Sequence, residues 1–228
     1  ADGQTGRANS VTVLNLGTRP IDQKIAEVEA TYANAGLPPR FRITPLSDPG
    51  LDARLAGSGY AVDDPAVVMI APLRQGLEID PSVWLADAAD RGWIETFCAT
   101  TGVDGTRRRA MEGIFERLVP PFVFASLGDD GALAAGPFGA LSLEAAAPET
   151  VAPDTVALGV VDNDLVCVLD VATRPEVRGR GLARRVVGTI LAWGGGQGAT
   201  TAMLQVGADN APAIALYRRL GFAQVYRY

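Results

Sequence analysis

The amino-acid sequence predicts an α+β fold that contains two related groups of elements. Short β-type runs alternate with stretches whose apolar residues recur at helical spacing, and turn residues separate them. The order strand, helix, strand, helix occurs near both ends of the chain. Hydrophobic residues make up 48% of the 228 residues, which is enough to bury a core in one or two domains.

The first group of elements lies in the N-terminal third of the chain. Ile25, Val28 and Tyr32 recur at helical spacing, which predicts a helix. Asp48 followed by Pro49 indicates the start of a second helix, because Asp caps helices and Pro fits their first turn. We expect strands at Ser10–Leu14, Phe41–Thr44 and Val67–Ala71 and helices at Asp22–Ala35 and Asp48–Ala56.

The second group lies at the C-terminal end and resembles the first. Asn210 precedes Phe222 by the same twelve residues that separate Asp48 from Tyr60, which indicates a diverged internal repeat. Two related domains, 1–74 and 75–228, follow from this reading. In this second group we expect strands at Val166–Ala172, at Met203–Val206 and after Gly221, and helices at Gly181–Trp193 and Asn210–Leu220.

The middle of the chain is less regular. Trp84, Trp93 and Phe97 occupy apolar positions of an amphipathic pattern. The predicted elements are helices at Asp80–Cys98 and Arg107–Leu118, a strand at Phe122–Leu127, and an extended hairpin or loop over residues 128–155, which are rich in Gly, Ala and Pro.

Composition excludes several classes of function. The chain contains no histidine, which removes Ser-His-Asp and Cys-His catalysis, and Cys98 and Cys167 lack metal-ligand spacing, so no metal site is expected. The net charge of −6 argues against a general nucleic-acid surface. No apolar run reaches the roughly 18 residues of a membrane-spanning helix. A soluble, cytoplasmic protein without a membrane or nucleic-acid partner is expected.

Positive charge gathers where a predicted strand turns into a helix. Gly179 and Gly181 lack the Cβ atoms that would obstruct a ligand, and a helix start leaves backbone N–H groups unpaired. Such a turn suits a pyrophosphate, although a Gly-Arg-Gly turn alone also fits a simple helix start. The arginines in this segment are Arg174, Arg178, Arg180, Arg184 and Arg185, offset there by Glu176.

Two motifs of this region resemble the GNAT superfamily of N-acetyltransferases. Arg178-x-x-Gly181-x-Ala183 is similar to the signature Arg/Gln-x-x-Gly-x-Gly/Ala. The segment from Leu204 to Phe222 is similar to a second signature, N-x-x-A-x-x-x-Y-x-x-x-G-F. The resemblance implies a mixed, mostly antiparallel sheet flanked by helices, and acetyl-CoA as cosubstrate.

The resemblance also implies roles for individual residues. Tyr217 would protonate the departing thiolate, and Asn210 would hydrogen-bond the cofactor arm. Backbone groups of Val171, Ala172 and Thr173 would pair with the pantetheine arm, while N–H groups of Gly179, Arg180, Gly181, Leu182, Ala183 and Arg184 would hold the pyrophosphate next to Arg178. Each role has a structural alternative: Asn210 suits an N-cap, Tyr217 suits the core, and the arginines suit a solvated helix face.

The general base departs from the family pattern. Many relatives have Glu at the position of Gln205, and an amide cannot accept the proton of the attacking amine. Asp170, acting through water, is the candidate base, although Asp170 and Asp209 also fit turn or capping positions. A base is unnecessary if the acceptor arrives as a free amine.

The N-terminal group departs further. The segment after Asn15 lacks the second glycine and the arginine cluster, and Asp48 and Leu55 replace the Asn and Tyr of the second motif. Domain 1–74 is therefore expected to be a degenerate GNAT-like domain that does not bind coenzyme A, beside an intact catalytic domain at 75–228. This tandem architecture is similar to that of mycothiol synthase.

The sequence thus predicts an N-acetyltransferase that uses acetyl-CoA. The acetyl group would pass to a primary amine by direct attack in a ternary complex, and the acceptor would be a small molecule or a peptide. A monomer or a homodimer is expected. The alternative is a coenzyme A-binding sensor or scaffold that has lost catalysis.

Overall fold

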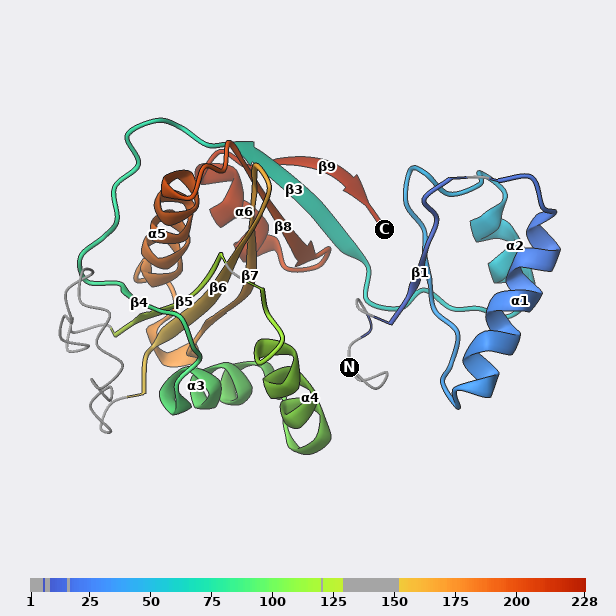
Figure 1. Ribbon diagram of the computed structural model, residues 1–228, viewed down its shortest axis with the longest axis horizontal. Coiled ribbons are helices and arrows are strands. Elements are labelled where there is room, and N and C mark those ends of the chain that lie inside the picture. The colour runs from blue at the N-terminus through green and yellow to red at the C-terminus, as the bar shows by residue number, and fades with distance from the viewer. Residues whose placement is uncertain (1–5, 7–8, 16, 120, 129–151) are drawn as a thin grey trace.

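The computed structural model describes residues 6, 9–15, 17–119, 121–128 and 152–228. A seven-stranded sheet with helices on both faces forms the larger part, and a small lobe containing a two-stranded sheet forms the rest (Figure 1). Most of the predicted hairpin or loop over 128–155 lies outside the described residues. The structure therefore has an α+β fold.

The large sheet has the strand order β4-β5-β6-β7-β8-β3-β9. Only the pair β7–β8 is parallel, and the other neighbours are antiparallel, which confirms the expected mixed, mostly antiparallel sheet. The strands are β3 (Ala66–Pro72), β4 (Trp84–Ala86), β5 (Phe122–Leu127), β6 (Thr155–Asp162), β7 (Leu165–Thr173), β8 (Thr201–Gly207) and β9 (Ala223–Arg227).

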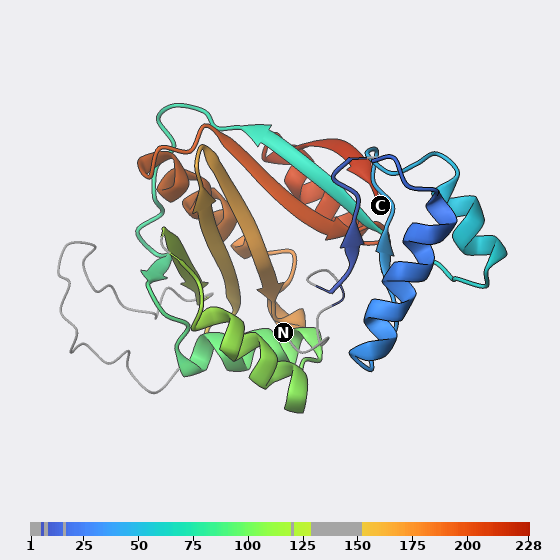
Figure 2. The same cartoon turned by 45° about the vertical axis from the view of Figure 1, so that its right-hand side comes forward.

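Helices cover both faces of this sheet (Figure 2). α5 (Leu182–Gly196) and α6 (Ala211–Arg219) pack on one face, where Val186, Ile190 and Tyr217 join the larger apolar core. α3 (Arg91–Thr101) and α4 (Gly105–Phe115) pack on the other. There Trp93, only 1% exposed, is the centre of a smaller core.

The N-terminal lobe has the same order of elements as the C-terminal end of the large sheet. β1 (Val11–Thr12), α1 (Ile21–Asn34), β2 (Phe41–Arg42) and α2 (Leu51–Gly57) follow one another, and β1 pairs in parallel with β2. β7, α5, β8 and α6 repeat this order, and β7 also pairs in parallel with β8. The shared topology is consistent with the proposed repeat, whose origin stays a prediction.

The strand that follows α2 crosses into the large sheet. β3 lies between β8 and β9 and pairs antiparallel with both. The large sheet therefore begins with residue 66, before the boundary predicted between residues 74 and 75. The apolar run of β3 explains this position, because Val67, Met69 and Ala71 join the main core.

Three elements differ from the sequence-based expectation. The residues expected to form one helix from Asp80 form β4 and then α3, because Asp90 caps α3 by accepting a hydrogen bond of 2.7 Å from the Trp93 N–H. β6 is an additional strand that the sequence analysis did not predict. α5 continues to Gly196, because Gly194 is a packing residue: a Cβ there would lie 2.7 Å from Val166 Cβ.

Candidate functional site

The main feature of the candidate site is an opening between the two parallel strands. β7 and β8 pair from Leu165 and Thr201 to Val168 and Leu204, and their pairing ends there. Both strands continue, β7 to Thr173 and β8 to Gly207. β7 stays paired with β6 along its other edge, so the edge of β7 that faces β8 is open beyond Val168.

A bulge in β7 lies within this opening. Asp170 has a φ of 51°, and the pairing of β6 with β7 shifts register at this point. Such a bulge exchanges the faces of the residues that follow it. Val171 consequently packs against the larger core and Ala172, 4% exposed, joins the smaller one, while the side chain of Asp170 is exposed.

The glycine turn follows directly after β7. A short 3₁₀ turn at Pro175–Val177 leads to Gly179 and Gly181, whose φ values of 82° and 83° lie in the left-handed region. Only glycine adopts this region readily, so both positions require glycine for their backbone conformation. A Cβ at either glycine would meet no atom within 4 Å, which shows that the turn is open.

The start of α5 presents unpaired donors at this turn. No side chain among the described residues caps the helix, and its first backbone hydrogen bond runs from the Arg185 N–H to the Gly181 oxygen at 3.2 Å. The N–H groups of Leu182, Ala183 and Arg184 precede that bond and lack helical acceptors. Leu182 is buried and anchors the turn, whereas Arg184 is exposed.

The five arginines of the segment do not act together. Arg178, Arg180 and Arg184 are exposed around the turn, and the Nε of Arg178 donates to the Thr173 oxygen at 3.1 Å. Arg174 lies 3.6 Å from an oxygen of Asp154. Arg185 instead forms an ion pair with Asp80.

Arg185 makes a two-pronged ion pair that the sequence analysis did not identify. Its Nε and Nη2 atoms donate to the two carboxylate oxygens of Asp80 at 2.7 and 3.2 Å. The guanidinium holds the pKa of the Asp80 carboxyl below its ordinary value. The Asp80 N–H also donates to Thr189 Oγ1, so this residue fastens the segment before β4 to α5. Arg185 is therefore a structural residue rather than part of an anion site.

α6 carries the two residues of the second motif. Asn210 is the N-cap, and its Oδ1 accepts a hydrogen bond of 3.2 Å from the Ala213 N–H. The capping role is thus present, and the side chain is exposed. Tyr217 packs in the larger core with its ring 6.0 Å from that of Phe222, and burial raises the pKa of its phenol to about 12.

Gln205 stands just beyond the last β7–β8 pair and points away from the larger core. It is the Cα partner of Val68 on β3, and its Oε1 accepts a hydrogen bond of 2.6 Å from the hydroxyl of Tyr228. The guanidinium carbon of Arg42 lies 4.7 Å from the centre of the Tyr228 ring. No sequence motif indicated Tyr228 or Arg42, since both reach the site only through strand pairing and lobe packing.

The two cysteine thiols and the metal-ligating side chains are the remaining reactive groups among the described residues. Burial raises the pKa of the thiols of Cys98 and Cys167. In the part of the chain that the structure describes, no group of three or more His, Cys, Asp or Glu residues could hold a metal ion. The helices among these residues are also too short or too polar to cross a membrane.

Comparisons with known proteins agree with this geometry. All 228 residues match the family described as "Probable histone acetyltransferase Rv0428c C-terminal". The uncharacterized N-acetyltransferase YobR of Bacillus subtilis (strain 168) is 29% identical over 229 residues, covering 98% of this chain and 83% of that protein.

Solved structures share the fold. The GCN5-related N-acetyltransferase of Sphaerobacter thermophilus has a TM-score of 0.62 at 18% identity. The match covers 91% of this chain and 64% of the Sphaerobacter chain. A tandem GNAT protein from the clavulanic acid biosynthesis pathway has a TM-score of 0.59 at 14% identity and covers 93% of this chain and 70% of its own.

Proposed function

This chain belongs to the family described as probable histone acetyltransferase Rv0428c C-terminal and is a GNAT acetyltransferase, and from this premise we propose that it transfers the acetyl group of acetyl-CoA to a primary amine. The transfer would occur by direct attack in a ternary complex. A new N–C bond forms as the C–S bond breaks; the nitrogen releases a proton and the departing sulfur gains one.

The opening between β7 and β8 is the observation that carries the proposal. An open strand edge offers backbone donors and acceptors to an extended amide chain, which can pair with it as an added strand. Val171, Ala172 and Thr173 lie on this edge, opposite the end of β8 that is paired with β3 but not with β7. Thr173 already accepts a hydrogen bond from Arg178, and its carbonyl oxygen keeps a second lone pair for a ligand.

The glycine turn fits the other end of such a ligand. The N–H groups at the start of α5 and the helix dipole favour an anion, and a pyrophosphate needs several donors at short range. We assign it to the N–H groups of Gly179, Arg180, Gly181, Leu182, Ala183 and Arg184. The exposed guanidinium groups of Arg178, Arg180 and Arg184 add charge at the same place.

Tyr217 is the proposed proton donor to the departing sulfur. A pKa of about 12 keeps the phenol protonated at neutral pH, as a donor must be. Full transfer to a thiolate with an ordinary pKa of about 8.5 is uphill by roughly 5 kcal/mol. Tyr217 would therefore stabilise the sulfur first by a hydrogen bond, and recover its own proton from solvent once transfer is complete.

Asp170 is the proposed base for the acceptor nitrogen, acting through water. Its side chain is exposed within the bulge of β7, beside the point where the strands separate. Gln205 cannot take this role, because an amide does not accept a proton at neutral pH. The raised pKa values of Cys98 and Cys167 support direct attack, since they disfavour the thiolates that a covalent intermediate would require.

Release of free thiol from acetyl-CoA in the presence of a panel of amines tests the proposal. Turnover with at least one primary amine and none without an acceptor is expected. The hydrogen-bonded Gln205 supports a second candidate, a catalytically inactive coenzyme A-binding sensor. Tight binding of coenzyme A by calorimetry without turnover on small amines, polyamines or lysine peptides would favour that candidate and exclude the transferase.

A further inference from the structure

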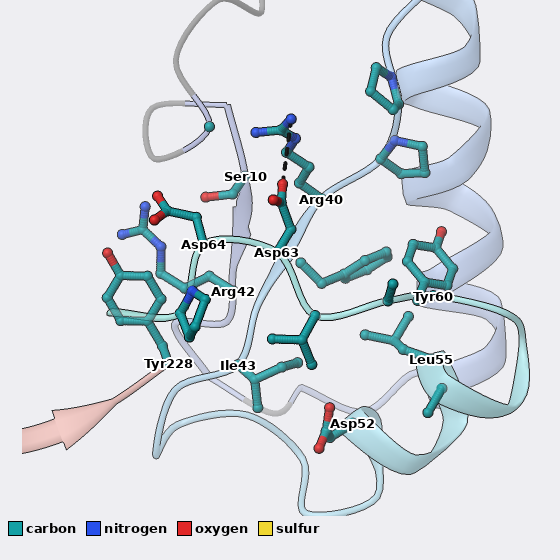
Figure 3. A pocket seen from close by; sticks show the side chains of 18 residues that line it. Ser10, Arg40, Arg42, Ile43, Asp52, Leu55, Tyr60, Asp63, Asp64 and Tyr228 are labelled. Atoms are coloured by element: carbon teal, nitrogen blue, oxygen red, sulfur yellow. Dashed lines mark ion pairs between the residues drawn. The ribbon is translucent and has the colours of Figure 1, made fainter. Parts of the chain in front are cut away.

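A pocket of about 370 Å³ lies in the N-terminal lobe, away from the glycine turn. Its size falls within the range of small-molecule sites. Figure 3 shows two ends that differ in character. Ile43, Leu55 and Tyr60 line an apolar end, while Arg40, Asp63, Asp64, Arg42 and Tyr228 line a polar end.

The apolar end contains a carboxylate. Asp52 lies there beside Ile43 and Leu55 (Figure 3), and within the described residues it has no hydrogen-bond or ion-pair partner. Phe41 and Tyr60 also line the pocket, with their rings edge to face at 5.5 Å. An anion next to aromatic and aliphatic surface is the environment that binds organic cations.

The charges at the polar end agree with such a ligand. Arg40 is matched by Asp63 at 3.6 Å, and the guanidinium of Arg42 lies over the ring of Tyr228. The lining as a whole holds three carboxylates and two guanidinium groups, so its formal charge is negative. Asp52 would repel an anionic ligand, because both arginines of the lining lie at the polar end and not beside Asp52.

Tyr228 connects this pocket to the proposed transfer site. Its ring lines the pocket, and its hydroxyl donates to Gln205 at 2.6 Å. Its backbone is held against β3 by two hydrogen bonds with Ala66, of 2.8 and 3.0 Å. A ligand that shifts the Tyr228 side chain therefore changes the hydrogen bond to Gln205 more readily than it moves the strand.

We propose that the pocket binds an organic cation with an apolar body and that Tyr228 transmits its occupancy to Gln205. The binding half is independent of catalysis, whereas an effect on acetyl transfer rests on the proposed function. The cation is either the distal end of the amine acceptor or a separate small molecule, and both share this chemistry.

The probe is a quaternary phenethylammonium, N,N,N-trimethylated so that it cannot accept an acetyl group, and its binding is measured by calorimetry on the whole chain. The wild type is expected to bind it, and 3-phenylpropionate, an anion of similar shape, at least tenfold more weakly. Asp52→Asn should weaken phenethylammonium binding about tenfold. The matched control is Asp48→Asn, which removes a carboxylate of the same lobe outside the pocket and keeps an oxygen for the Gly50 N–H; it should change affinity by less than about twofold.

The connection is tested by the side-chain amide resonance of Gln205 in ¹⁵N NMR spectra, which needs no turnover. Phenethylammonium should shift this resonance in the wild type and not in Tyr228→Phe. Absence of binding, equal binding of the anion, or equal effects of the two Asp variants would overturn the site. A Gln205 resonance that ignores the bound probe would overturn the connection.

Kinetics then separate the two sources. If the pocket takes the distal end of the acceptor, phenethylammonium raises the apparent KM of a long diamine and leaves that of a short monoamine unchanged. If the ligand is a separate molecule, the probe changes kcat for the short monoamine. Absence of acetyl transfer to any amine would contradict the proposed function, whereas the binding and NMR results would still test the pocket.

Discussion

Val168 and Leu204 are the last Cα partners of the parallel strands β7 and β8, and beyond them the two strands separate. The separation places an open strand edge, a bulge at Asp170 and an uncapped helix start within one short segment of chain. The strand edge and the helix start leave backbone groups available to a ligand, and the side chain of Asp170 is exposed at the bulge.

Gly181→Val is expected to abolish coenzyme A binding. The φ of 83° at this position is strained for a side chain by about 1–2 kcal/mol, and more for a β-branched one, so the turn would reshape. Calorimetry with coenzyme A measures the loss. Gly188→Ala is the control: it lies inside α5 with no atom within 4 Å of a new Cβ, so it should stabilise the fold by roughly 1 kcal/mol and spare affinity. Unchanged affinity in Gly181→Val would remove the turn from the site.

Tyr217→Phe is expected to lower kcat at least tenfold with little change in coenzyme A affinity, because it removes only the proposed proton donor. The ring and its packing against Phe222 are kept, so the fold should be as stable as the wild type. Steady-state kinetics and calorimetry provide the two values. Tyr32→Phe, in α1, controls for loss of a hydroxyl elsewhere. Equal losses of rate and affinity would contradict the donor role.

The pKa of Tyr217 also predicts a loss of stability at alkaline pH. The folded pKa of about 12 exceeds the unfolded value of 10.0, so the folded state holds its proton more tightly and stability falls as pH rises from 10 towards 12. The loss amounts to about 2 to 3 kcal/mol at pH 12. The free energy of unfolding, measured with urea from pH 8 to 12, should decline less for Tyr217→Phe than for the wild type. Tyr60, whose pKa is also raised to about 12, is present in both proteins, so its contribution cancels from the comparison. Parallel declines would show that Tyr217 titrates normally.

Arg184→Ala and Arg185→Ala should affect different properties although the residues are adjacent. Arg184 is exposed at the start of α5, so its loss should weaken coenzyme A binding about three- to tenfold, and less so in high salt. Arg185 is paired with Asp80, so its loss should leave affinity unchanged and reduce stability by at most about 1 kcal/mol, because both side chains are partly solvated. Thermal denaturation and calorimetry distinguish them. A loss of coenzyme A affinity in both variants would show that Arg185 also belongs to the anion site.

Asp170→Asn is expected to reduce kcat/KM at neutral pH about tenfold or more, because it removes the proposed base. Asn tolerates a φ of 51° better than most residues, so this variant keeps the bulge and removes only the carboxylate. Asp170→Ala adds backbone strain and should lower stability as well. An unchanged kcat/KM in steady-state kinetics would mean that the acceptor arrives as a free amine.

Several parts of this protein can be read from the sequence, because they depend on local chemistry. The glycines of the turn, the capping Asn210 and the spacing to Tyr217 all act within a few residues of one another. The helix periods of α1 and α5 likewise follow from neighbouring apolar residues. The α+β class and the acetyltransferase family follow from these local patterns.

Only the tertiary structure decided which distant residues meet. Nothing in the order of residues shows that β3 inserts between β8 and β9, since strand pairing depends on the closure of a long stretch of chain. The same holds for Arg185, which the sequence placed with the other arginines and the fold paired with Asp80, 105 residues away. Tyr228 reaches both Gln205 and the N-terminal pocket for this reason: its contacts come from the packing of one lobe against an edge strand.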